Sequence, residues 1–143
     1  MLQKFMALFG DTFKLPESFD TKAGVMGVPA DINGKGSFDL EIVGESNYRQ
    51  SIWAALPPEI SKQGDFRQYF IAKLVEENDN EHDKKAVAIK IKGIVGHLAR
   101  EDAKLYRKWR TKNNIGSEAT CRCVVVGKRG VPDYGIWVDH PSL

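Results

Sequence analysis

The shortage of helices between strand-like segments is the feature that most constrains how this chain can fold. Apolar and polar residues alternate in about six short segments, whereas only residues 100–113 combine helical periodicity with acids near the start and cations near the end. Parallel sheets need a crossover connection, usually a helix, between successive strands. The sequence therefore predicts a mainly β fold, a small antiparallel barrel with one or two helices packed on it.

The strand-like segments are bounded by glycine, proline or other turn-forming residues. A short helical turn is expected before Pro57-Pro58, and Gly116 is expected to end the long helix. The expected strands lie within residues 38–44, 65–78, 85–93, 94–99, 119–130 and 134–139.

The first 36 residues differ in composition from the rest of the chain. Four apolar residues from Leu2 to Phe9 follow the spacing of one helical face, which is typical of a short amphipathic helix that packs on the domain or anchors it to a partner or membrane. Residues 10–36 are rich in glycine, proline and turn formers. We therefore divide the chain into an N-terminal extension, residues 1–36, and one barrel domain, residues 37–143.

The net charge of +2 hides an uneven distribution. Residues 1–83 hold eight Lys or Arg against fourteen Asp or Glu, whereas residues 84–113 hold ten against two. Residues 114–143 hold three of each. The cationic block produces a local field that attracts polyanions even when the charge of the whole chain is small. Charge alone does not decide the function, because solvated lysine-rich helices carry similar runs.

Cysteine content and hydropathy bear on the compartment. Cys121 and Cys123, the only two cysteines, point to one face of an expected strand, which is poor geometry for a mutual disulfide. Reduced thiols favour a cytoplasmic protein, or a nuclear one in a eukaryote, over a secreted one. The apolar run from Phe5 to Phe9 is too short for a signal peptide, and no segment approaches the length of a membrane span. We expect neither a membrane partner nor a cofactor.

A dense polar run, EENDNEHD at residues 76–83, leads directly into an alternating strand segment. A calcium loop of the EF-hand type is excluded, because its glycine position holds Lys84 and its bidentate acid position holds Lys90. The acids and amides of the run are also suited to capping a turn between two strands. A metal-dependent nuclease is an alternative, although no HExxH or paired-cysteine motif supports it; its ligands would be Asp79, His82, Asp83 and His97.

Several spaced pieces of the sequence resemble the HIRAN domain family. The stretch EENDNEHDKKAVAIKI is followed at short spacing by GIVGHLAREDA, while IVGESNY lies upstream and YGIWVD lies near the end. The resemblance spans residues 37–140. It implies a modified oligonucleotide-binding (OB) fold and a non-catalytic module that binds single-stranded DNA near a free 3′ end. A larger DNA-processing complex is the partner that such a module would serve.

The resemblance also implies roles for individual residues. Asp83 would accept a hydrogen bond from the terminal 3′-hydroxyl, and Asn80 would bind the end nucleotide. Tyr48 would stack on a base or sugar, while His97 and Arg100 would face a phosphate. The full set of candidate nucleic-acid-binding residues is Tyr48, Asn80, His82, Asp83, His97, Arg100, Lys90, Lys104 and Lys108.

The chemistry of these residue types agrees with end recognition. A carboxylate accepts a hydrogen bond from a hydroxyl but repels an internal phosphate, so Asp83 inside a positive rim would prefer a strand end. Stacking on Tyr48 would contribute ~1–3 kcal/mol with any base. The lysines would neutralise the backbone and make binding sensitive to salt. Glu81 and His82 stand where the family has proline and tyrosine.

Another alternative remains open on the sequence alone. A protein-interaction adaptor would dock its partner through the N-terminal extension or an edge of the barrel, and its basic helix would serve solubility. Trp109 and Trp137 are expected to pack in the core, whereas Trp53 is suited either to packing or to stacking on a base.

Overall fold

The computed structural model describes residues 30–61, 65–141 and 143. The predicted amphipathic helix between Leu2 and Phe9 lies outside these residues. The strands are β1 (Ala30–Asp31), β2 (Leu40–Val43), β3 (Phe66–Glu77), β4 (Ala86–Lys90), β5 (Ile94–Leu98), β6 (Glu118–Lys128) and β7 (Val131–Val138). The helices are the 3-10 turn η1 (Glu45–Tyr48) and the α-helices α2 (Arg49–Ala55), α3 (Pro58–Ser61) and α4 (Arg100–Lys112). None of the helices in the described ranges has the length and apolar character needed to cross a membrane.

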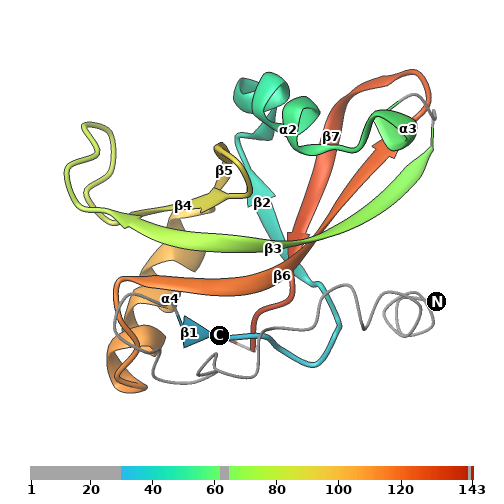
Figure 1. Cartoon of the computed structure of the whole chain (residues 1–143). Helices are drawn as coiled ribbons and strands as arrows, with labels where there is room; N and C mark the ends of the chain where they lie inside the picture. The colour runs from blue at the N-terminus through green and yellow to red at the C-terminus, as the bar shows by residue number, and fades with distance from the viewer. Residues whose placement is uncertain (1–29, 62–64, 142) are drawn as a thin grey trace.

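Strands β2 to β7 form a closed antiparallel barrel (Figure 1). They follow the order β6-β3-β4-β5-β2-β7, and β7 pairs again with β6 to close the sheet. β1 joins β6 in parallel as an additional strand. The prediction of a mainly β, OB-fold-like barrel of about six strands is confirmed; it expected one or two helices, and the described residues hold three α-helices and one 3-10 turn.

β3 is long enough to pair with two different strands along its length. Residues 66–75 pair with β6, and residues 73–77 pair with β4. Figure 1 shows β3 and β6 as long curved strands, with the hairpin of β4 and β5 beside them. The loop between β3 and β4 projects beyond the barrel at the end of β3. The first two residues of the polar run, Glu76 and Glu77, still belong to β3, and the other six lie in the loop.

The barrel interior is filled by small and branched apolar side chains. Leu74, Val87 and Ile89 are fully buried, as the alternation in β3 and β4 requires. Cys121 and Cys123 are buried free thiols, which confirms the prediction that they do not form a disulfide. Burial raises the pKa of both thiols, to about 12 for Cys123. Neither sulfur is therefore a nucleophile near neutral pH.

Helix α4 packs against β4 and β5. Ala103 and Tyr106 are buried on its inner side, and the ring of Trp109 stacks on Tyr106 with centroids 6.2 Å apart. Trp109 also lies edge-on to the buried His140, at 4.6 Å between centroids. Trp109 packs on the main core and Trp137 on a smaller outer cluster, so both were correctly predicted as packing residues.

The predicted end of this helix at Gly116 is wrong. α4 ends at Lys112, and Asn114 takes the left-handed conformation at φ 55°. Asparagine tolerates this region better than most residues with a side chain. The chain turns back because Ile115 is buried and its N–H donates to the Arg110 carbonyl at 3.0 Å.

The described part of the predicted N-terminal extension packs on the barrel. Ala30 and Ile32 are buried, and the buried Asp139 carboxylate accepts a hydrogen bond from the Gly36 N–H at 2.9 Å. Arg122 forms an ion pair with the other oxygen of that carboxylate, also at 2.9 Å. Residues 30–36 are therefore held by the barrel through both apolar and polar contacts.

Replacing Gly96 with alanine is expected to lower the free energy of unfolding by ~1–3 kcal/mol, the usual effect of overpacking. A Cβ at Gly96 would overlap Ile42 Cγ2 and would lie 2.9 Å from the Val43 carbonyl oxygen. Urea unfolding of the variant measures the change. Gly116→Ala is the control, because a Cβ there meets no atom within 4 Å. Equal midpoints for the two variants would contradict the prediction.

Candidate functional site

His97 belongs to a row of residues that crosses four strands on the outer face of the barrel. The strand register aligns Val75, Ala88, His97 and Val43 across β3, β4, β5 and β2. Residues two apart on a strand share a face, so Glu77 lies on the same outer face as Val75, at the end of β3. The register thus brings a carboxylate next to the histidine.

Glu77 connects His97 to the loop that follows β3. His97 Nε2 lies 2.7 Å from Glu77 Oε1, and Asn80 Nδ2 donates to the same oxygen at 3.1 Å. An ionised carboxylate only accepts, so Nε2 carries the proton. The Tyr48 ring, from η1, lies against the His97 ring with centroids 5.8 Å apart and planes tilted by 48°. The Tyr48 ring thus lies against a His97 ring that Glu77 orients.

Asp83 is held by hydrogen bonds to its backbone and to its side chain. Asn80 Oδ1 accepts from the N–H groups of His82 and Asp83, at 2.9 and 3.0 Å. Asp83 Oδ1 accepts from the Lys85 N–H at 2.9 Å, which confirms the prediction that this acid caps a turn. Its second oxygen, Oδ2, lies 3.6 Å from Nε of Arg100, the first residue of α4.

One arginine that was not among the predicted site residues fixes this loop to α4. Arg107 Nε donates to the Lys85 carbonyl at 2.8 Å, and Nη2 donates to the Ala86 carbonyl at 2.9 Å. Nη1 donates to Asn78 Oδ1 at 2.8 Å and lies 3.1 Å from Glu76 Oε1. A single guanidinium thus fixes both ends of the loop, as its planar fork of donors allows.

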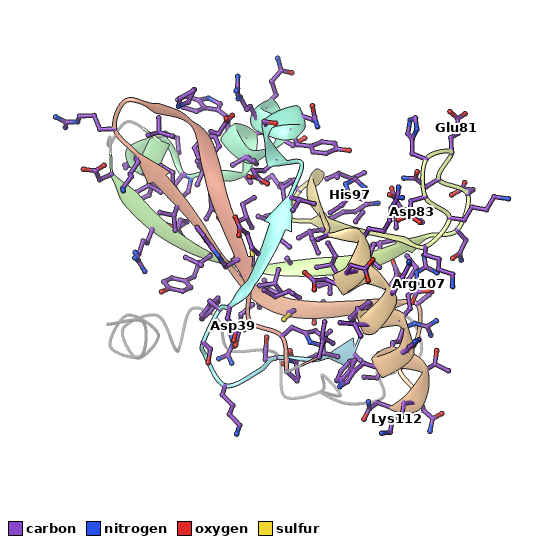
Figure 2. All side chains as sticks on the ribbon, turned by 180° about the vertical axis from the view of Figure 1, so that it is seen from behind. Asp39, Glu81, Asp83, His97, Arg107 and Lys112 are labelled. Atoms are coloured by element: carbon purple, nitrogen blue, oxygen red, sulfur yellow. The ribbon has the colours of Figure 1, made fainter. Side chains whose placement is uncertain are left out.

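The loop presents its acids in different directions. In Figure 2, Asp83 lies at the base of the loop on the side of His97, whereas Glu81 extends from the outer tip. Arg107 lies beneath the loop on α4. Glu81 and its neighbour His82 are exposed, while Asp83 has a side chain only 23% exposed. The acid expected to repel phosphate therefore points away from the acid expected to bind a hydroxyl.

The structure does not bring all the predicted residues together. Asn80 uses its amide within the loop, through the contacts to Glu77, His82 and Asp83 given above. Lys90 lies opposite Lys73 near the other end of β4, away from the loop. The two remaining lysines, Lys104 and Lys108, are exposed on α4.

Two further observations bear on the alternatives. Across residues 30–61, 65–141 and 143, no three His, Cys, Asp or Glu side chains are grouped so that they could hold a metal ion. Trp53 is 56% exposed and, with Pro132 and Tyr134, lines a shallow depression on the barrel surface.

Glu77 and Arg107 are the site residues that the sequence prediction missed. Glu77 carried a signal, because the period of two in β3 places it on one face with Val75. Arg107 carried none, since nothing in the sequence separates it from the other five cations of the same helix. Comparison with protein-family models, with curated proteins and with solved structures finds no match to this chain.

Proposed function

We propose that this chain is a non-catalytic, HIRAN-like module that binds single-stranded DNA near a free 3′ end. The observation that supports this most is the arrangement of the Asp83 carboxylate. Its Oδ1 accepts the hydrogen bond that caps the turn, whereas its Oδ2 has only the loose ion pair with Arg100. Such a module would act in the cytoplasm or nucleus as part of a larger DNA-processing complex.

The proposed recognition begins at Asp83 Oδ2. This oxygen accepts a hydrogen bond from the terminal 3′-hydroxyl, a charge-assisted bond that a 3′-phosphate cannot donate in the same way. Arg100 is 67% exposed and only loosely paired at 3.6 Å, so it is free to turn toward the last internal phosphate. A carboxylate next to a mobile cation favours a strand end over a continuous backbone.

The aromatic pair supplies a surface for stacking. Tyr48 lies against His97, whose ring is oriented by Glu77. A base stacked on Tyr48 contributes ~1–3 kcal/mol without sequence preference.

Titration of fluorescently labelled oligonucleotides by anisotropy tests the proposal. The protein is expected to bind a strand with a 3′-hydroxyl about tenfold or more tightly than the same strand with a 3′-phosphate, the difference that a hydrogen bond to a charged group supplies. Changing the 5′ end from hydroxyl to phosphate is the control and should leave the affinity nearly unchanged. Equal affinities for the two 3′ ends would refute end recognition.

A further inference from the structure

A groove lined by cations runs along the outer side of α4. Lys104, Lys108 and Lys112 border it at four-residue spacing, and Lys85 borders it from the loop before β4. Arg100 lies one turn ahead of Lys104 on the same helix. The groove therefore begins close to the loop that carries the proposed end-binding carboxylate.

Two arginines give the groove a fixed floor. Arg107 is held by the loop carbonyls and by Glu76, and Arg110 donates to Glu76 Oε1 at 3.1 Å and to the Ile115 carbonyl at 2.9 Å. Their side chains are 16% and 23% exposed, and that of Glu76 is 3% exposed. The floor is rigid because a buried carboxylate holds both guanidiniums.

The lysines on the rim are largely uncompensated. Lys104 approaches Glu101 at 3.9 Å, but that acid is 83% exposed, so the pair is weak. Among the described residues, no acid lies within 4.0 Å of the ammonium groups of Lys85, Lys108 or Lys112. Free ammonium groups around a concave surface match a chain of phosphates rather than an apolar partner.

On the basis of the proposed function, we infer that this groove carries the phosphodiester backbone of the strand whose 3′ end lies at Asp83. The strand would run along α4 with its 5′ side toward Lys112, since Arg100 and Asp83 lie at the other end of the helix. The thirteen residues from Arg100 to Lys112 place the first and last Cα atoms about 18 Å apart, at 1.5 Å per step. A stacked strand rising ~3.4 Å per nucleotide covers that length with roughly five nucleotides.

Crosslinking from single cysteines tests the path and its direction. Both native thiols are buried, so Lys104→Cys or Lys112→Cys would be the only reactive site for a maleimide photocrosslinker. With a 5′-labelled oligothymidine carrying a 3′-hydroxyl, adducts from Lys112→Cys are expected about five nucleotides from the 3′ end. Adducts from Lys104→Cys are expected nearer that end. Lys128→Cys, exposed at the far end of β6, is the control and should give few adducts.

The reverse order of adducts, or the same positions for both variants, would overturn the inferred path. So would equal yields from the Lys128→Cys control. A second measurement uses Lys108→Gln with Lys112→Gln. The slope of log affinity against log salt is negative, and this double variant is expected to reduce its magnitude by about 1.4. Each lost contact to a phosphate of a single strand removes ~0.7. An unchanged slope would also overturn the inference.

The two proposals fail in different ways. If the preference for a 3′-hydroxyl persists while the lysine variants behave as wild type, the groove inference falls and the end-binding function stands. If neither 3′ end is preferred, the proposed function falls, and the directional path along α4 falls with it. The inference holds only when end preference, adduct order and the salt slope all agree.

Discussion

Asp83→Asn is expected to remove most of the preference for a 3′-hydroxyl over a 3′-phosphate, a change of about tenfold or more in the affinity ratio. Asparagine keeps the shape of the side chain, and its Oδ1 can still accept from the Lys85 N–H. The substitution removes the negative charge that repels a terminal phosphate and that makes a hydrogen bond from a hydroxyl contribute roughly 1.5–3 kcal/mol. Anisotropy titrations of both oligonucleotides measure the ratio.

Glu81→Gln is the matched control, because it removes one negative charge from the same loop. Glu81 is exposed at the outer tip and points away from the side on which Asp83 lies (Figure 2). Its removal should raise the affinity for both strands slightly and equally, as a general reduction in repulsion does. If the ratio of affinities for the 3′-hydroxyl and 3′-phosphate strands is unchanged in Asp83→Asn, Asp83 does not recognise the end. The same conclusion follows if that ratio falls to about one in Glu81→Gln.

The barrel was predictable from the sequence because each strand carries its own burial signal. Leu74, Val87 and Ile89 alternate with less buried or smaller neighbours, and this period of two requires a sheet with one enclosed face. Short links between the segments favour antiparallel neighbours. The exact end of α4 was not predictable, because Asn114 and Gly116 are both suited to a helix terminus and the burial of Ile115 decides between them.

The candidate site was predictable only in part. Asp83 and Arg100 lie close together as expected, since a short hairpin brings the polar run near the start of α4. The anchoring of the loop depends on contacts between Arg107 and residues near the end of β3, 29 positions away at Asn78. No local pattern encodes such a contact. It forms only once the helix has packed against β4 and β5.

Glu76→Gln is expected to lower the free energy of unfolding by about 3 kcal/mol or more, the usual effect of breaking a buried ion pair from one side. The Glu76 carboxylate is 3% exposed and forms ion pairs with Arg107 and Arg110. Glutamine fits the same space but leaves two partly buried guanidiniums without a counter-charge. Urea unfolding measures the loss, and Glu118→Gln is the control, because its pair with Lys73 is about half exposed at 4.0 Å.

Arg107→Lys separates the ion pair from the anchoring of the loop. Lysine keeps a positive charge near Glu76, but a single ammonium group cannot reach the Asn78 amide and the Lys85 and Ala86 carbonyls together. Stability should therefore fall less than in Glu76→Gln, while the preference for a 3′-hydroxyl falls with the loss of loop order. If Glu76→Gln unfolds within 1 kcal/mol of Glu118→Gln, the buried carboxylate does not hold α4 and the loop in place. Full end preference in Arg107→Lys would show that Asp83 keeps its position without the guanidinium.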